Sequence, residues 1–166
     1  MTRPDTELLT ISVMNRRSLL IAGGAAVLLS PLMAAAQEPP AQASERSGVF
    51  EEAYGALTAG GTPLEGKVTL ELPDIAENGN FVPLTVNVDS PMTPENYVKA
   101  IHILSTGNPV ARVASFHLSP INGIAKVQSR IRLAKTQDVI ALAQLSSGVL
   151  LAGTATVKVT IGGCSG

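Results

Sequence analysis

Beyond Gly66, hydrophobic and polar residues alternate along most of the chain. The alternation is regular at residues 68–72, 82–88, 126–133 and 156–161, and less regular apolar runs occupy residues 97–104, 110–118 and 139–145. Because successive side chains of a strand point to opposite faces, these segments predict strands with one buried face. Turn-forming pairs separate them, among them Asn78-Gly79 and Ser147-Gly148. About seven short antiparallel strands with this spacing predict an all-β, immunoglobulin-like β-sandwich.

A single short helix is predicted before the first strand, at residues 49–59. Its apolar side chains fall at helical spacing (Phe50, Ala53, Tyr54 and Leu57). Two glycines and then Pro63 follow, and these residues are typical of a helix end. We expect this helix to cover one edge of the sandwich.

The N-terminal region has the features of an export signal. Arg16-Arg17 precedes a weakly hydrophobic run at residues 18–33, and Ala34-Ala35-Ala36 offers a cleavage site with small side chains. The run is too short and too interrupted by glycine and proline for a membrane span. Residues 1–36 are therefore predicted to be a removed signal peptide that resembles the twin-arginine type, which implies a periplasmic location. An ordinary secretory signal is the alternative, and Met14 is an alternative start.

The remaining chain is predicted to form one domain. Residues 37–47 are rich in proline, glutamine and alanine and predict a flexible linker, and residues 48–161 are the sandwich. Aromatic residues make up 3% of the chain, tryptophan is absent, and there is one cysteine, so no internal disulfide is available. The core must therefore be built from Val, Ile, Leu and Ala. The net charge of −1 gives no electrostatic reason to expect nucleic acid or an anionic membrane as partner.

The single cysteine stands in the C-terminal sequence Gly162-Gly163-Cys164-Ser165-Gly166. Glycine visits conformations that other residues avoid, so residues 162–166 predict a mobile arm with its hinge at the glycines and Ser165. An unpaired thiol in an exported protein indicates reactivity or pairing with another molecule, although an incidental cysteine in a loose tail is the alternative. Nothing on the arm favours the thiolate, and the Gly166 carboxylate opposes it. Activation of Cys164 is therefore expected from a partner.

Other chemistry-bearing residues give weaker signals. His102 and His117 invite a metal site, with methionines as further ligands, but both lie within strand patterns beside large apolar residues. We therefore expect neither a metal site nor a cofactor. Arg130 and Arg132 share one face of a strand, which fits a contact with an anionic substrate or partner and equally fits a solvated face.

Several segments of the chain form a distinctive combination. The longest is the stretch of residues 70–83 that contains Ala76-Glu77-Asn78-Gly79. The others are Asp89-Ser90-Pro91-Met92-Thr93, Asn108-Pro109, Phe116-His117-Leu118, residues 129–134, and the ending Val159-Thr160-Ile161-Gly162-Gly163-Cys164. Together these segments resemble the SoxY family, the carrier subunit of the bacterial sulfur-oxidising system. The family tail usually has glycine where this chain has Ser165, which narrows the backbone freedom of the arm.

The resemblance implies a non-catalytic carrier that holds thiosulfate or sulfane sulfur covalently on Cys164. It implies a heterodimer with SoxZ and transient contacts with the haem-containing SoxAX, the sulfohydrolase SoxB and the sulfane dehydrogenase SoxCD. Two other functions are left open at this point. One is a periplasmic copper or zinc carrier that uses Cys164 with a histidine, and the other is a structural immunoglobulin-like module.

Overall fold

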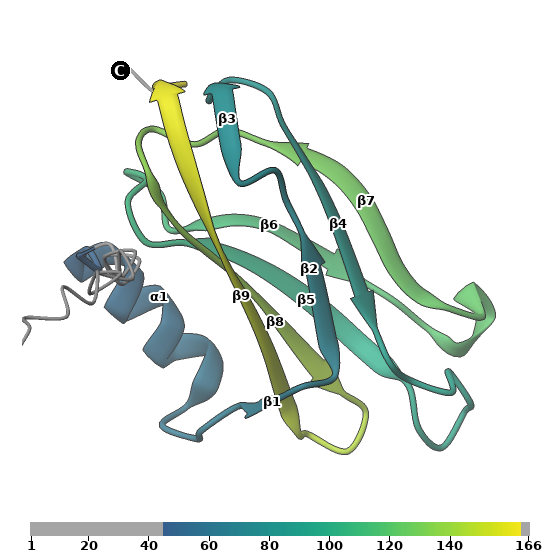
Figure 1. Cartoon of the computed structure of the whole chain (residues 1–166). Coiled ribbons are helices and arrows are strands. Elements are labelled where there is room, and N and C mark those ends of the chain that lie inside the picture. Colours follow the sequence, from purple (N-terminus) through teal and green to yellow (C-terminus); the bar gives the residue numbers. More distant parts are fainter. Residues whose placement is uncertain (1–44, 164–166) are drawn as a thin grey trace, which may run out of the picture. The chain divides into compact units, whose positions relative to one another are not determined.

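The computed structural model describes residues 45–163. The predicted signal peptide with Arg16 and Arg17, most of the predicted linker, and Cys164, Ser165 and Gly166 lie outside the described residues. One helix and nine strands make up the described chain, shown in Figure 1. They are α1 (Gly48–Thr58), β1 (Leu64–Glu65), β2 (Val68–Glu71), β3 (Ile75–Asn78), β4 (Val82–Val88), β5 (Val98–Ser105), β6 (Arg112–His117), β7 (Ala125–Ile131), β8 (Gln137–Leu145) and β9 (Leu150–Ile161), with a 3-10 turn at Pro120–Asn122.

The strands form two packed sheets, which confirms the predicted sandwich. The first sheet has the order β1-β9-β8-β5-β6, and β3 also pairs with β9. The second sheet has the order β2-β4-β7. The pairs within the second sheet and the β5, β6, β8 and β9 pairs are antiparallel, whereas β1 and β3 run parallel to β9. The first sheet is therefore mixed rather than wholly antiparallel.

The two parallel pairings share one edge of β9. β1 pairs with residues 151 and 152, near the start of β9, and β3 pairs with residues 158–161 at its end. Between them, β2 leaves this edge and joins the second sheet (Figure 1). Gly153 permits the close passage of β2, because a Cβ there would lie 2.7 Å from the carbonyl oxygen of Val68. The chain thus returns to β9 just where β9 ends.

The core between the sheets contains aliphatic side chains, as the composition predicts. Inward positions of β4 and β7 face those of β5, β8 and β9 across the sandwich. Burial of such side chains is the main favourable contribution to folding. Fully buried members include Val82, Val86, Val98, Ile101, Ile103, Leu133, Val139 and Val157.

Helix α1 covers a face of the first sheet rather than the predicted edge. Ser47 caps it, since its Oγ accepts a hydrogen bond from the Phe50 amide at 3.3 Å. The Phe50 ring is completely buried, in a second apolar cluster with Leu104 of β5 and Leu142 of β8. These two leucines lie on the face turned away from the second sheet, so the helix is needed to exclude water from it.

Three features of the strands differ from the prediction. β1 and β3 were not predicted, because Leu64 and Ile75 are exposed and their short segments lack a buried alternation. β9 begins at Leu150 rather than at Thr156. β1 and β3 pair with β9 across long sequence separations, whereas the early part of β9 pairs with β8 in the adjacent hairpin.

Candidate functional site

The backbone leading to Cys164 leaves the sandwich at the end of β9. There β3 lies beside β9, with Asn78 opposite Ile161. Figure 1 shows the ends of β3 and β9 together at one end of the sandwich, with the β7–β8 connection passing nearby. The described chain stops at Gly163, and the predicted attachment residue Cys164 is the next residue.

Backbone hydrogen bonds tie three segments together at this point. The Gly79 amide donates to the Ile161 carbonyl at 2.8 Å, and the Leu133 amide donates to the Gly79 carbonyl at 2.8 Å. The Gly163 amide donates to the Leu133 carbonyl at 2.9 Å. The start of the tail is therefore bound to both the β3–β4 turn and the β7–β8 loop. We call this arrangement the glycine clamp, made of Gly79, Gly162, Gly163 and Leu133.

The clamp leaves no room for side chains at its three glycines. A Cβ on Gly162 would overlap the carbonyl oxygen of Ala134, and a Cβ on Gly163 would overlap the backbone of Gly79 and Asn80. A Cβ on Gly79 would overlap the carbonyl oxygen of Leu133. The sequence prediction treated Gly162 and Gly163 as a free hinge. In the structure the backbone at both positions packs too closely for a Cβ, and the Gly163 amide is hydrogen-bonded; their role as a hinge stays a prediction. The hinge positions Ser165 and Gly166 lie outside the described residues.

The buried amide side chains of Asn108 and Gln137 hold the β7–β8 loop by hydrogen bonds. Asn108 Nδ2 donates to the Arg132 carbonyl at 2.8 Å, and Asn108 Oδ1 accepts from the Ala134 amide at 2.9 Å and from Gln137 Nε2 at 2.8 Å. Gln137 Oε1 in turn accepts from the Gly107 amide at 2.7 Å. Asn108 is 7% exposed and Gln137 is 0% exposed, so these bonds are shielded from water. The sequence analysis named Asn108 only within a family-like segment, and it missed this support because the residues that Asn108 contacts are distant in the sequence.

Three arginines line a groove beside the clamp. The groove has a volume of about 420 Å3 and lies between β6 and β7, the outer strands of the two sheets. Its charged residues are Arg112, Arg130 and Arg132. The Arg130 guanidinium stacks on the Phe81 ring, 4.5 Å from its centroid. The sequence named Arg130 and Arg132 as neighbours on one face, and the structure adds Arg112 from the other sheet.

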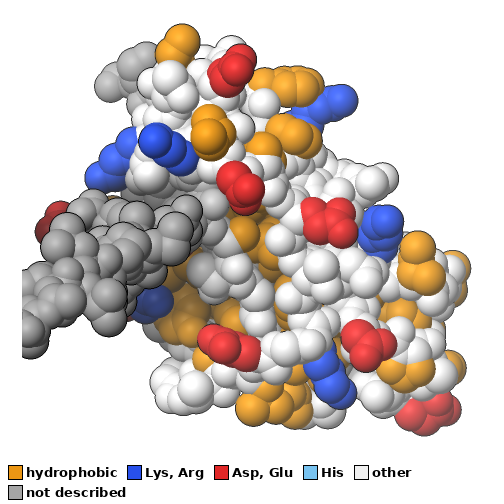
Figure 2. Space-filling model, viewed as in Figure 1, with side chains coloured by type: hydrophobic (Ala, Val, Ile, Leu, Met, Phe, Trp, Pro, Cys, Tyr) orange, Lys and Arg blue, Asp and Glu red, His pale blue; other side chains and the backbone are white. Residues whose placement is uncertain are grey.

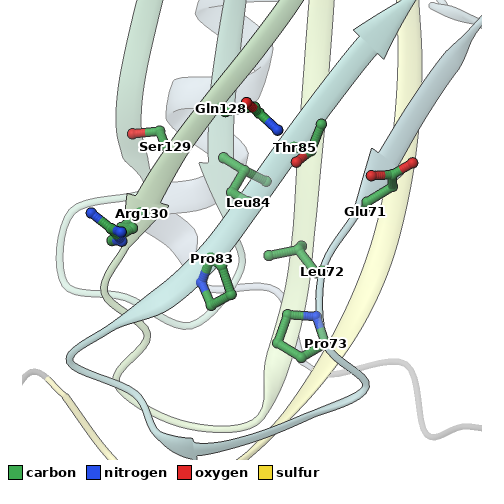
Figure 3. Close-up of a pocket in the computed structure, with 9 residues that line it drawn as sticks. All are labelled: Glu71, Leu72, Pro73, Pro83, Leu84, Thr85, Gln128, Ser129 and Arg130. Carbon is green, nitrogen blue, oxygen red and sulfur yellow. The ribbon is translucent and has the colours of Figure 1, made fainter.

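A larger hollow of about 820 Å3 lies on the second sheet (Figure 3). Figure 3 shows Glu71 of β2 at one side and Arg130 of β7 at the other, with Pro83 and Thr85 of β4 between them. On the face shown in Figure 2, over β9, β2 and β4, acidic and basic side chains are interspersed. The Glu71 carboxylate in this hollow would repel an anion, whereas no carboxylate lines the arginine groove. Of the two hollows, the smaller one suits an anionic ligand.

His102 and His117 lie together on the first sheet. Their ring centroids are 6.3 Å apart in an edge arrangement, and His102 Nδ1 is 2.8 Å from Ser115 Oγ. Desolvation by burial, and then the charges of Arg112 and His117, lower the pKa of His102 below its usual 6.5. Within residues 45–163, no group of three or more His, Cys, Asp or Glu side chains could hold a metal ion. A pair of imidazoles falls short of the three or four protein ligands of common zinc sites.

None of the helices among the described residues is long and apolar enough to span a bilayer.

The chain is similar to a known protein family and to a solved structure of that family. The family described as "Sulfur oxidation protein SoxY" matches residues 55–164. The sulfur carrier protein SoxY from Chlorobium limicola f thiosulfatophilum has a similar structure, with a TM-score of 0.55, 33% identity, and coverage of 69% of this chain and 100% of that chain. The search of curated proteins gave no match.

A second solved structure shows likeness of fold alone. It is superoxide reductase (neelaredoxin) from Ignicoccus hospitalis, with a TM-score of 0.51, 16% identity, and coverage of 57% of this chain and 80% of that chain. The SoxY match, by contrast, includes more than half of this chain and runs through Cys164. The chain belongs to the SoxY family of sulfur-oxidation proteins.

Proposed function

We propose that this protein is a sulfur carrier that holds oxidised sulfur intermediates covalently on Cys164 and presents them to partner enzymes. The observation that carries the proposal is the glycine clamp, which holds Gly163, the residue directly before Cys164, at the end of the sandwich. Two further findings support it. The SoxY family match extends through Cys164, and a 33% identical SoxY of known structure is described as a sulfur carrier protein.

The chemistry of loading needs an external oxidant. When the Cys164 thiol and thiosulfate combine, an S–S bond forms between the cysteine sulfur and the terminal sulfur of thiosulfate. The thiol proton goes to water, and two electrons go to the oxidant. A partner with c-type haem, the role that SoxAX has in the resemblance, would accept them. The thiolate is the reacting form of cysteine, so a partner that favours the thiolate would speed this step.

Unloading needs water and a hydrolase. Water adds to the terminal sulfonate, the S–S bond to that group breaks, and sulfate and two protons leave, so that Cys164 keeps a persulfide. In the resemblance this step belongs to SoxB, and later oxidation of the persulfide belongs to SoxCD. The carrier itself contributes a fixed point of attachment. SoxZ as the second subunit and the periplasm as the location are parts of the same proposal.

Intact-mass measurement tests the proposal. The mature protein, produced with SoxZ, is incubated with thiosulfate and the haem-containing oxidising complex. We expect a mass gain of one bound thiosulfate that a reductant removes. Cys164→Ser should show no gain, and Ser165→Gly should load as the natural chain does. An unchanged mass of the natural chain, beside an oxidising complex that loads another SoxY, would refute the carrier function.

A further inference from the structure

We propose that the groove lined by Arg112, Arg130 and Arg132 binds the sulfonate end of the sulfur adduct on Cys164. The ligand class is a sulfur oxoanion at the end of a short chain attached to the cysteine. The inference rests on the proposed carrier function and adds a binding site to it. It also accounts for the arginine pair that the sequence left open between a ligand contact and a solvated face.

The groove joins cationic and apolar surface without acidic residues. Arg112 begins β6 of the first sheet, Arg130 lies in β7 of the second sheet, and Arg132 follows β7 directly. Their side chains are exposed, and no ion pair of these arginines is present within residues 45–163. The rest of the lining consists of Asn108, Pro109, Val110, Val113 and Ile131. The groove therefore concentrates positive charge that carboxylates of the described chain do not neutralise.

The β7–β8 loop connects the groove to the start of the tail. The carbonyl that accepts the Gly163 amide belongs to Leu133, and Arg132 is the residue before it. Bond lengths then place the Cα atoms of Arg132 and Gly163 within about 11 Å of each other. An adduct that extends from Cys164, added to the length of an arginine side chain, can bridge this separation.

A second connection runs through the β3–β4 turn. A Cβ on Gly163 would overlap the backbone nitrogen of Asn80, and Phe81 is the residue after Asn80. The Phe81 ring holds the Arg130 guanidinium at 4.5 Å from its centroid. Both backbone segments that clamp Gly163 therefore lead, within one or two residues, to an arginine of the groove.

The chemistry of the groove fits a sulfonate. Guanidinium groups donate paired hydrogen bonds to planar or tetrahedral oxoanions, and they remain charged at all working pH values. Val110 and Val113 add apolar surface beside the guanidinium groups. Arginine charge would also favour the approach of the thiosulfate dianion to a thiolate that otherwise repels it.

The test compares two thiol reagents on the mature chain. An anionic methanethiosulfonate with a sulfonatoethyl group and neutral methyl methanethiosulfonate both form a disulfide with Cys164 and release methanesulfinate. We expect the ratio of the anionic to the neutral rate constant to fall about tenfold when all three arginines are changed to glutamine, because electrostatic steering is lost. The neutral reagent corrects for any change in the exposure or acidity of the thiol.

A control variant of equal charge separates a groove from general attraction. Lys67→Gln, Lys99→Gln and Lys126→Gln together remove three exposed positive charges at the end of the sandwich remote from Gly163. Salt screens such distant charges, so this variant should change the ratio by less than about twofold. Equal falls in both variants, or no fall in the arginine variant, would overturn the proposal.

A second measurement uses the natural chain and does not depend on the variants folding. Side-chain Nε–Hε signals of the arginines are recorded by NMR for two Cys164 adducts, one with the sulfonatoethyl group and one with a methyl group. Signals of Arg112, Arg130 and Arg132 should move in the first adduct and stay in place in the second. Identical spectra would refute the groove.

Failure of this proposal can be told apart from failure of the carrier function. Suppose that thiosulfate loads the natural chain but the ratio of the anionic to the neutral rate constant is unchanged in the arginine variant. The groove proposal would then be refuted and the carrier function would stand. An arginine-dependent ratio in a chain that never loads would show an anion site beside a thiol that carries no sulfur.

Discussion

Two groups of glycines in this fold serve opposite purposes. Gly148, in the β8–β9 hairpin, has a φ of +86°, and a Cβ there would meet nothing within 4 Å. Gly79 and Gly163, in the clamp, are outside the group of positive-φ glycines, yet a Cβ on either would overlap neighbouring backbone. The hairpin needs glycine for its backbone freedom, whereas the clamp needs glycine for close packing. A pair of glycines is therefore not in itself a sign of mobility.

The two ends of the sandwich also differ in how many backbone segments hold them. At the hairpin end, a turn is exposed and a local substitution affects local geometry. At the clamp end, three backbone segments converge, and buried Asn108 and Gln137 hold one of them. The position of Gly163 thus depends on contacts between loops that are far apart in the sequence.

Gly79→Ala should give the largest effect. The new methyl group would overlap the Leu133 carbonyl and lie 2.9 Å from Val159 Cγ1, so β3 or the β7–β8 loop must move. We expect the free energy of unfolding to fall by about 4 kcal/mol, at the high end for a single added methyl group. Urea unfolding followed by circular dichroism measures this.

The matched control for this change is Gly55→Ala, in α1, where nothing lies within 4 Å of the added Cβ. There alanine should raise stability by about 1 kcal/mol, because it favours helix more than glycine does. If Gly79→Ala destabilised the protein no more than Gly148→Ala does in the open hairpin, the distinction between the two groups of glycines would not hold.

Asn108→Ala should have the next largest effect. It removes three hydrogen bonds of a 7% exposed side chain and leaves the Ala134 amide and the Arg132 carbonyl without this partner. We expect a loss of about 3 kcal/mol. The exposed Asn87, on β4, is the control, and Asn87→Ala should change stability by less than about 0.5 kcal/mol.

Amide hydrogen exchange sharpens the same prediction. The Gly163 amide, whose acceptor belongs to the supported loop, should exchange faster in Asn108→Ala than in the natural chain. Asn108→Asp keeps the acceptor oxygen for the Ala134 amide and should recover part of the protection. Unchanged exchange at Gly163 would show that the loop does not need its buried support.

Gly148→Ala should cost less than either change. The φ of +86° is unfavourable for a residue with a Cβ, and no neighbour is close enough to clash. The expected loss is about 1 to 2 kcal/mol, the usual cost of a left-handed backbone for alanine. Thermal unfolding measures it, and exchange at Gly163 should stay the same. A rise in Gly163 exchange in this variant would contradict the independence of the two ends.

The smallest effect is expected from His102, which lies away from both ends. Since folding lowers its pKa below 6.5, protons bind the unfolded chain more tightly. The contribution of the neutral imidazole to stability is complete above about pH 6.5 and is lost as the pH falls toward the folded pKa. His102→Gln should make stability less sensitive to pH between 7.5 and 5. Equal pH dependence in both chains would exclude this role for His102.

Much of the fold follows from the sequence, because alternation marks strands with one buried face. Val82, Leu84, Val86 and Val88 give β4 its inward face, and the predicted strand has the observed bounds. The short edge strand β3 gave no such signal, since Ile75 is exposed and its partner in β9 is 83 positions away at Lys158. Local patterns do not encode such pairings.

The candidate site was likewise predictable only where it depends on residues that are close together in the sequence. The sequence singled out Cys164 and its glycines, and it noted Arg130 and Arg132 as a pair. It did not indicate Asn108 and Gln137 as supports or Arg112 as a third member of the groove. Those relations arise only when the β5–β6 and β7–β8 connections lie side by side. The hinge at Gly162 and Gly163 is a prediction from residue type, whereas the close packing of their backbone comes from segments that are distant in the sequence.

The most direct test of the clamp is NMR relaxation of the Gly163 amide in the natural mature chain. A hydrogen bond to Leu133 and the absence of space around Gly163 predict an order parameter near that of Val157 in β9, about 0.85. The same value should persist after Cys164 is modified. An order parameter below about 0.6 would show that the hinge begins before Cys164 and would contradict the role that we assign to the glycine clamp.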